Sequence, residues 1–162
     1  MVKKQKETKT NAIREVEAAG LPCEVRTFEC EEALSGVEVA QMLDLDPDRV
    51  FKTLVTVGRS GEHYVFMVPV AEELDLKRAA QAVNEKSIEM IRSRELLPLT
   101  GYIHGGCSPI GMKKQFHTVA DETVQLFDTI YFSGGRIGCQ LEMAPNDLEK
   151  IVPLQYADIT VR

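Results

Sequence analysis

The sequence predicts an α+β domain with a mixed, mostly antiparallel sheet and short helices around it. The chain has 162 residues, 44% of them hydrophobic, which suffices for one well-buried domain and is short for two. Short β-branched runs typical of strands are interleaved with short helical patterns. Tight turns join neighbouring strands more often than helices do, which favours hairpins over a doubly wound parallel sheet.

Capping residues and hydrophobic periodicity delimit the elements of the first half. Thr10 can cap a first helix, and Gly20 followed by Leu21-Pro22 can end it. Pro47 can restart the chain in a first helical turn. The other elements expected here are a strand at 23–30, a helix at 36–43, a strand at 50–57, a turn at 58–61 and a strand at 64–70.

The second half continues with a helix and then alternates strands with glycine-rich loops. Asp75 can cap the helix, whose inner face carries apolar residues. Pro98 is expected to close a helical turn at 93–97. The remaining elements expected are strands at 87–91, 116–120, 129–133, 139–144 and 155–160, and a helix at 145–152 that begins with Pro145.

Composition and net charge indicate where the protein is located and which kinds of partner it binds. Residues 1–8 are basic and no apolar core follows them, so we expect a flexible leader and a folded domain over 9–162. No run approaches the roughly 18 apolar residues of a membrane span, and a cytoplasmic protein without membrane contact is expected. The net charge of −6 argues against nonspecific coating of nucleic acid, although it permits a brief, local encounter.

The cysteines and histidines do not form a metal-binding pattern. The four cysteines lack any CxxC pair and the three histidines are dispersed, whereas structural zinc sites usually show tight ligand spacing. We therefore expect no metal, no cofactor and reduced thiols.

Two glycine clusters a short stretch apart are the most informative feature. The first runs from Gly105 to Gly111 and the second from Ser133 to Gly138. Glycine lets the backbone enter left-handed conformations and approach another molecule closely, and successive N–H groups in such loops attract anions. Each cluster carries a hydroxyl, Ser108 or Ser133, and basic residues lie nearby. The pair predicts a shared binding site, although each loop alone would usually be an ordinary turn.

Lys52 is the second notable feature. It lies within a run of apolar and β-branched residues at 50–57, where strand alternation can place it on an otherwise apolar surface. A lysine in such a place can orient or polarise a carbonyl or a phosphate. The alternative is a solvated lysine on the outer face of an edge strand.

Several familiar sites do not fit the glycine loops. The segment around Ser108 is not a G-x-S-x-G elbow, so a triad with His104 is disfavoured. Cys107 has no base near it in sequence, which makes it a poor nucleophile candidate. No G-K-[ST] and no G-x-G-x-x-G occurs, so nucleotide hydrolysis and hydride transfer are poor interpretations.

Three ordered motifs nevertheless form a familiar set. They are Phe51-Lys52-Thr53-Leu54; Gly101-Tyr102 followed by Gly105-Gly106-x-Ser108-Pro109-x-Gly111-x-Lys113-Lys114; and Ile130-Tyr131-x-Ser133-Gly134-Gly135-x-x-Gly138 followed by Glu142-x-Ala144-Pro145-x-Asp147-Leu148. In this order and spacing they resemble the YbaK/EbsC family, over about residues 8–160. This family comprises freestanding bacterial Cys-tRNA(Pro) deacylases, which are related to the editing domain of bacterial prolyl-tRNA synthetases.

The resemblance implies a fold and a set of site residues. The fold would be a mixed β-barrel or curved sheet flanked by helices, without metal or cofactor. The implied catalytic residues are Lys52, Gly105 and Ser133, with substrate binding by Phe28, Ser35, Gly36, Thr53, Gly106, Ser108, Gly134, Gly135 and Arg136. Phe28 falls where relatives often carry tyrosine, and Ser35-Gly36 where some carry Phe-Gly, so the pocket rim is expected to differ.

The resemblance also implies a reaction. A trans-editing hydrolase of this family cleaves the ester of mischarged Cys-tRNA(Pro), and the thiol of the cysteinyl group itself attacks the ester carbonyl. The protein then supplies positioning, N–H donors and a lysine. The implied partners are the acceptor end of the tRNA and prolyl-tRNA synthetase in a transient complex. Two alternatives stay open, namely Ala-tRNA(Pro) editing with a positioned water and a non-catalytic module that binds the acceptor end.

Overall fold

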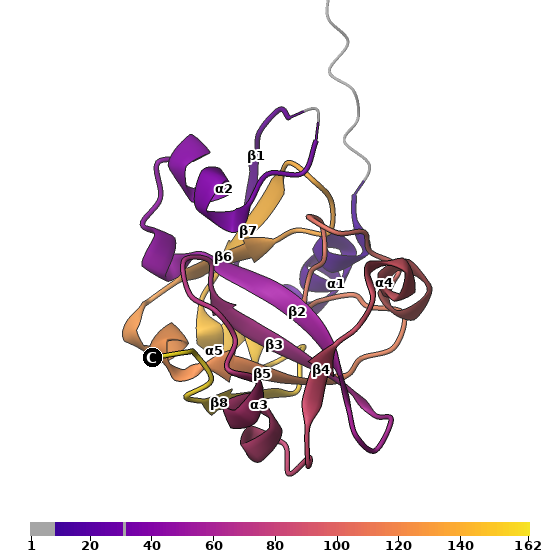
Figure 1. Ribbon diagram of the computed structural model, residues 1–162. Coiled ribbons are helices and arrows are strands. Elements are labelled where there is room, and N and C mark those ends of the chain that lie inside the picture. The colour runs from indigo at the N-terminus through magenta and orange to yellow at the C-terminus, as the bar shows by residue number, and fades with distance from the viewer. Residues whose placement is uncertain (1–8, 31) are drawn as a thin grey trace, which may run out of the picture.

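The computed structural model describes residues 9–30 and 32–162 and has an α+β fold, as predicted (Figure 1). The expected leader at 1–8 lies outside the described residues. The helices are α1 (Asn11–Ala19), α2 (Gly36–Met42), α3 (Leu76–Ala82), α4 (Ser93–Thr100) and α5 (Pro145–Leu148), with 3-10 helices η1 (Pro47–Arg49) and η2 (Glu122–Leu126). The strands are β1 (Glu24–Thr27), β2 (Phe51–Gly58), β3 (His63–Pro69), β4 (Ile88–Met90), β5 (His117–Asp121), β6 (Ile130–Ser133), β7 (Cys139–Met143) and β8 (Leu154–Ala157).

The strands form two open sheets rather than one closed barrel. The smaller sheet has the order β1-β7-β6 and is antiparallel throughout. In the larger sheet, β4-β2-β3-β5-β8, the pairs β4-β2 and β2-β3 are antiparallel, while β3-β5 and β5-β8 are parallel. The expected mixed, mostly antiparallel pairing is therefore confirmed. An isolated parallel bridge between Val50 and Tyr131 brings the two sheets together just before β2 begins.

The helix termini follow from the local sequence. Ile13 N–H donates to Thr10 Oγ1 (3.1 Å) at the start of α1, and Gly20 ends that helix in the left-handed region at φ 67°. Ser35 and Glu38 form a reciprocal capping box at the start of α2. This box fixes the direction from which the chain enters α2, and Ser35 lies beside the pocket described below.

Two predicted helix ends are wrong. The turn expected to close at Pro98 continues as α4 to Thr100, because Leu96 and Leu99 pack against a buried cluster that includes Tyr102, and this packing offsets the N–H that proline lacks. The helix expected over 145–152 ends as α5 at Leu148. The residues after α5 form turns instead, consistent with Pro153, which disfavours helical geometry in the residue before it.

The main core lies between the two sheets. Phe51 and Met67 of the larger sheet pack in one cluster with Leu141 and Met143 of the smaller sheet and with Val16 of α1. Because side chains alternate along a strand, the neighbours of Met67 face the other way. Those neighbours, Phe66 and Val68, pack with Ala79 and Ala80 of α3 on the opposite face.

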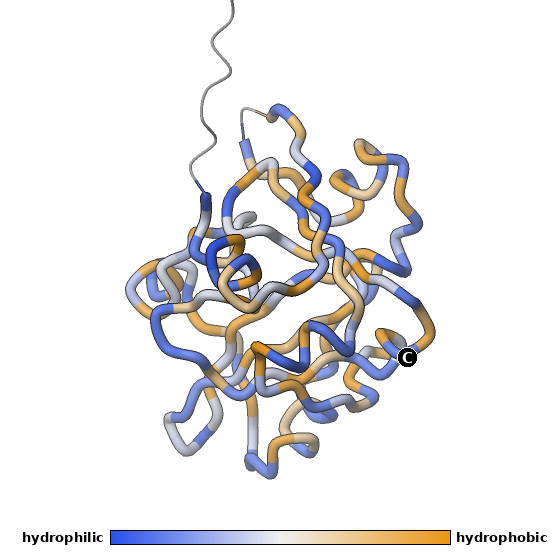
Figure 2. Tube along the Cα trace, turned by 180° about the vertical axis from the view of Figure 1, so that it is seen from behind, coloured by the Kyte–Doolittle hydropathy of each residue, from blue (hydrophilic) through white to orange (hydrophobic). Residues whose placement is uncertain are grey.

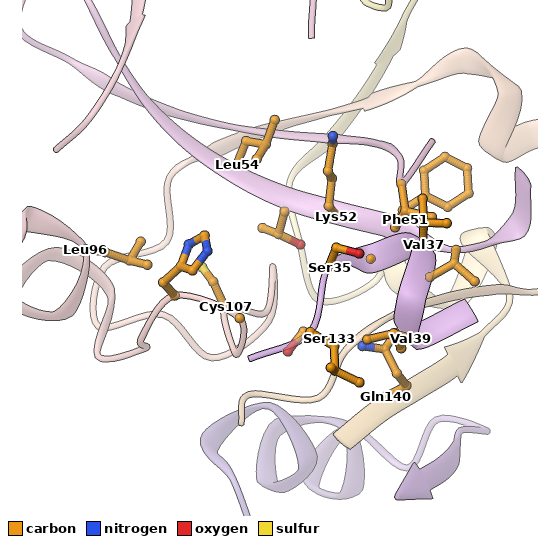
Figure 3. A pocket seen from close by; sticks show the side chains of 17 residues that line it. Ser35, Val37, Val39, Phe51, Lys52, Leu54, Leu96, Cys107, Ser133 and Gln140 are labelled. Atoms are coloured by element: carbon orange, nitrogen blue, oxygen red, sulfur yellow. The ribbon is translucent and has the colours of Figure 1, made fainter. Parts of the chain in front are cut away.

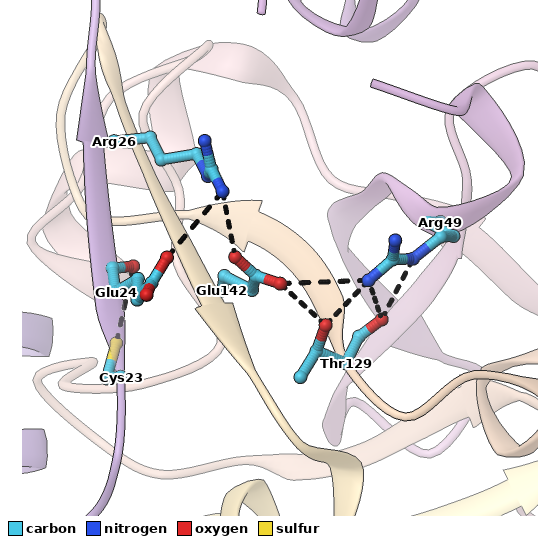
Figure 4. Close-up of polar contacts among 6 residues, drawn as sticks. All are labelled: Cys23, Glu24, Arg26, Arg49, Thr129 and Glu142. Atoms are coloured by element: carbon cyan, nitrogen blue, oxygen red, sulfur yellow. Dashed lines mark hydrogen bonds and ion pairs between the residues drawn. The ribbon is translucent and has the colours of Figure 1, made fainter. Parts of the chain in front are cut away.

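A polar network ties the smaller sheet to η1, which leads directly into β2 (Figure 4). Glu142 accepts hydrogen bonds from Arg26 Nη2 (3.2 Å) and Thr129 Oγ1 (2.7 Å), and Arg49 Nη2 donates to the Thr129 carbonyl (3.0 Å). Burial opposes the charge of Glu142, but hydrogen bonds from Thr129, Arg26 and Tyr131 together hold its pKa below the ordinary value. The network thus anchors the start of β2.

Hydrophobic and hydrophilic residues are mixed along the whole trace (Figure 2). None of the helices among the described residues combines the length and the apolar character that crossing a membrane would require.

Candidate functional site

A pocket of about 370 Å³ lies beside the first half of β2. Its polar lining comes from Ser35, Lys52, Thr53, His104, Ser133 and Gln140, and its apolar walls include Val37, Val39, Val50, Phe51, Leu54, Val70 and Leu96 (Figure 3). These residues lie in or directly beside α2, α4, β2, β3, the first glycine loop and the smaller sheet. Residues of both sheets therefore line the pocket.

The pocket forms because one edge of β2 is open there. β4 pairs with β2 only over Thr56–Gly58, whereas β3 pairs with it from Phe51 to Val57. Over Phe51 to Leu54, no described strand covers the edge of β2 that β4 covers further along. An open strand edge presents backbone N–H and C=O groups, and here such an edge borders a cavity.

The two glycine loops meet, as the sequence predicts. A Cβ added at Gly106 would lie 2.9 Å from Arg136 Cα and 3.0 Å from its carbonyl carbon. Gly105 has a left-handed φ of 84°, and a Cβ there would lie 2.7 Å from Ala33 Cβ. Gly105 and Ser133 both line the pocket. The glycines therefore permit a close contact between two backbones at the pocket wall.

Gly106→Ala is expected to destabilise the protein by about 1–3 kcal/mol, because the new methyl group must push the two loop backbones apart. The same shift would displace Gly105 and Ser133 and lower the activity proposed below. Thermal unfolding and rate measurements check both effects. Gly61→Ala serves as the control, since a Cβ at Gly61 meets nothing within 4 Å although its φ is 91°. It should lower stability through backbone strain and leave the activity intact; equal activity losses in the two variants would contradict the prediction.

Lys52 lines the pocket, but its ammonium group does not face the second glycine loop. In Figure 3, Lys52 and Leu54 leave β2 on the same side, and the Lys52 nitrogen points away from Ser133. Thr53 leaves the strand on the opposite side. Among the described residues, the Lys52 ammonium makes no hydrogen bond or ion pair. Lys52 thus offers a cation at the pocket without a partner among the described residues, and Thr53 lines the same pocket from the other side of the strand.

Six of the predicted site residues line the pocket, namely Ser35, Gly36, Lys52, Thr53, Gly105 and Ser133. Six others do not, namely Phe28, Gly106, Ser108, Gly134, Gly135 and Arg136. Ser108 is fully buried, and its hydroxyl accepts the Ile110 N–H (3.3 Å) and so shapes its own turn. Gly135 N–H donates to Ser133 Oγ (3.2 Å), and this hydrogen bond orients the Ser133 side chain, which lines the pocket.

Phe28 and Arg136 lie around the second glycine loop. Phe28 N–H donates to the Gly138 carbonyl (2.9 Å), and a Cβ at Gly138 would lie 2.5 Å from the Phe28 carbonyl oxygen. The Arg136 backbone contacts the position of Gly106, as described above. Both residues hold the loop in place at a distance from the cavity itself.

Gln140 is a pocket residue that the sequence reasoning missed. It lies on β7 directly opposite Ser133 of β6, and only 8% of it is exposed. Its Oε1 is buried without a hydrogen-bond partner among the residues that the structure describes, and so is Oγ1 of Thr53. Gln140 and Glu142 alternate with apolar residues over 139–143, a pattern typical of a strand with one polar face, so the sequence carried no signal that Gln140 lines a pocket.

Cys107 also lines the pocket, but its thiol is poorly suited to nucleophilic attack. Burial is the main cause that raises its pKa to about 12, and a hydrogen bond with Thr100 only partly offsets this. The thiolate is the reactive form of cysteine, so Cys107 stays protonated near neutral pH. In the described part of the chain, no three His, Cys, Asp or Glu side chains are grouped so that they could hold a metal ion.

The chain matches known proteins along its whole length. The family model "Aminoacyl-tRNA editing domain" matches residues 30–151. A protein of Enterococcus faecalis named "Putative Cys-tRNA(Pro)/Cys-tRNA(Cys) deacylase EbsC" is 44% identical over 163 residues, which cover 100% of this chain and 99% of that protein. A proline–tRNA ligase of Pelobacter propionicus is 32% identical over 84 residues, which cover 52% of this chain and 15% of the ligase.

Solved structures share the fold. One described as "a putative trans-editing enzyme for prolyl tRNA synthetase" is 24% identical with a TM-score of 0.83 and covers 96% of this chain and 100% of its own. The hypothetical protein APE2540 is 22% identical with a TM-score of 0.84 and covers 93% of this chain and 99% of its own. The resemblance to the YbaK/EbsC family is thereby confirmed, and the chain belongs to the family of aminoacyl-tRNA editing domains.

Proposed function

We propose that this protein hydrolyses the ester bond of Cys-tRNA(Pro). The observation that carries the proposal is the 44% identity to EbsC over the full length of both chains. The pocket supports it, because residues of all three family motifs meet there, represented by Lys52, Gly105 and Ser133. The cavity of about 370 Å³ has room for a small aminoacyl group.

The chemistry we propose uses the substrate's own thiol as the nucleophile. The sulfur attacks the ester carbonyl carbon, the bond from that carbon to the ribose oxygen breaks, and the ribose oxygen takes up the thiol proton. The products are a tRNA with a free terminal hydroxyl and a four-membered thiolactone, which water then opens to cysteine. This division of labour agrees with a pocket in which Cys107, its one lining thiol, is protonated.

The protein's contribution would be positioning and electrostatic stabilisation. Backbone N–H groups at the meeting glycine loops are candidates for holding the developing oxyanion, and preorganised donors of this kind supply about 3–4 kcal/mol each in well-studied enzymes. Lys52, whose ammonium is directed away from Ser133 (Figure 3), is suited to a phosphate of the terminal nucleotide. We assign it to gripping the acceptor end.

We further propose a transient complex with prolyl-tRNA synthetase, which would select the tRNA. The local match to a proline–tRNA ligase supports an evolutionary connection between this domain and that enzyme. The net charge of −6 is consistent with weak, salt-sensitive binding of tRNA by the protein alone. A partner that binds the tRNA body would compensate for this.

Deacylation of Cys-, Ala- and Pro-tRNA(Pro), assayed side by side, tests the proposed function. Cys-tRNA(Pro) should be cleaved fastest and Pro-tRNA(Pro) should be spared. Faster cleavage of Ala-tRNA(Pro) would instead indicate a positioned water as nucleophile. Binding of the acceptor end without cleavage of any substrate would indicate a non-catalytic module.

Chelator treatment and Cys107→Ala are each expected to leave at least half of the deacylation rate. The described residues form no metal-binding group, and the high pKa of the Cys107 thiol removes it as a nucleophile. Rates on Cys-tRNA(Pro) with and without chelator, and for the variant, provide the check. Thermal unfolding of Cys107→Ala is needed alongside, because the thiol is buried. A large loss in a folded variant would restore the nucleophile hypothesis, and a loss with chelator would restore the metal hypothesis.

A further inference from the structure

Two buried polar atoms line the pocket from opposite sheets and lack hydrogen-bond partners in the described part of the chain. They are Gln140 Oε1 on β7 of the small sheet and Thr53 Oγ1 on β2 of the large sheet. Gln140 is more than nine-tenths buried. Leaving a buried acceptor unpaired is costly, so a ligand that brings hydrogen-bond donors to these atoms would be favoured.

The other side-chain hydroxyls of the pocket already accept hydrogen bonds. Ser133 Oγ accepts from Gly135 N–H (3.2 Å), and Ser35 Oγ accepts from Glu38 N–H (3.2 Å). Figure 3 shows Gln140 beside Ser133 and Val39, across the cavity from Lys52. No described hydrogen bond holds the Gln140 amide, so a half-turn of its last torsion can present either its oxygen or its nitrogen.

The lining of the pocket points to one group of the substrate. An aminoacyl ester carries an α-amino group with two or three N–H donors, and a carboxylate is the usual partner for such a group. Among the described residues that line the pocket, none is Asp or Glu. Among the described residues that line the pocket, Gln140 Oε1 and Thr53 Oγ1 are the buried side-chain acceptors that have no hydrogen-bond partner.

We propose that Gln140, together with Thr53, binds the α-amino group of the aminoacyl ester. This inference rests on the proposed function. Holding the amino group between the two sheets fixes the rotation of the ester carbonyl, so that its oxygen faces the N–H groups of the glycine loops. Gln140 is then a recognition residue for the part that all amino acids share, and it acts independently of the thiol.

The test compares Cys-tRNA with 3-mercaptopropionyl-tRNA, which keeps the thiol and lacks the amine. The wild-type protein should cleave the Cys-tRNA about 30-fold faster, the effect of losing one or two hydrogen bonds to a charged group. In Gln140→Met, which keeps the side-chain length and removes the amide, this ratio should fall to about 3-fold or less. Gln81→Met makes the same change on the exposed face of α3 and should keep the wild-type ratio.

The outcomes distinguish a failure of the proposed deacylase function from a failure of the proposed role of Gln140. If the wild-type protein cleaves neither substrate, the proposed function fails. If it cleaves both at equal rates, or if Gln140→Met slows both substrates equally, the function stands and the role of Gln140 is overturned. Should Gln140→Met not fold in thermal unfolding, Gln140→Glu keeps the shape and an acceptor oxygen and should preserve the ratio within about 3-fold. A ratio near 1 in a folded Gln140→Glu would also overturn the inference.

Discussion

Lys52→Ala is expected to lower kcat/KM for Cys-tRNA(Pro) by about 100-fold, because a charge-assisted hydrogen bond to a phosphate is worth about 1.5–3 kcal/mol and the pocket offers no second cation to replace it. The loss should fall mainly on KM if Lys52 grips the acceptor end in ground state and transition state alike. Deacylation rates over a range of tRNA concentrations separate kcat from KM.

Stability should hardly change in this variant. The Lys52 ammonium makes no hydrogen bond or ion pair with the described residues, and truncating a partly exposed side chain at an open strand edge leaves no core cavity. Lys77→Ala on the exposed face of α3 is the matched control and should behave as wild type. Retention of activity in Lys52→Ala, or a fall in kcat with KM unchanged, would contradict the assignment to the acceptor end.

Much of the fold could be predicted because its signals are local. Thr10 and Gly20 delimit α1 through their own capping geometry, and the turn from Gly58 to Gly61 joins two strands whose pattern is unambiguous. The predicted ends of α4 and α5 were wrong in opposite directions, since α4 is longer and α5 is shorter than expected. Tertiary packing of Leu96 and Leu99 overrides the proline in one case, and tight turns replace the helix ahead of Pro153 in the other.

In the candidate site, too, features set by the local sequence could be predicted and features set by tertiary packing could not. That the two glycine loops lie together agrees with the shared site that the pair predicts, because glycine permits the close approach of two backbones that the contact requires. The role of Ser108 was not, since a hydroxyl in a turn caps its own backbone as readily as it binds a ligand. The position of Gln140 in the pocket could not be predicted for a further reason. Its meaning depends on the open edge of β2 across the cavity, and that edge arises from how far β4 extends, a tertiary property.

The source of specificity can be isolated by exchanging one atom of the substrate. Cys-tRNA and Ser-tRNA differ only in sulfur against oxygen, and a change of one small group in a pocket alters transition-state binding by about 1–3 kcal/mol, or roughly 10- to 200-fold. A free cysteine thiol is a few per cent ionised at pH 7 and intrinsically very nucleophilic, whereas a hydroxyl needs an adjacent base. Among the described residues, the pocket lining contains His104 but no carboxylate to orient it as such a base.

We therefore expect the isolated protein to cleave Cys-tRNA at least about 1,000-fold faster than Ser-tRNA or Ala-tRNA, which is more than pocket binding alone supplies. The same preference should hold on several tRNA species, because the protein's own grip is confined to the acceptor end and selection among tRNAs would come from the synthetase. Single-turnover rates on Cys-, Ser- and Ala-esters of tRNA(Pro) and of one unrelated tRNA provide the measurement. A difference of about 200-fold or less between Cys- and Ser-tRNA lies within what pocket binding alone can produce. That outcome would rule out the substrate thiol as the main source of specificity and indicate a water positioned by the protein.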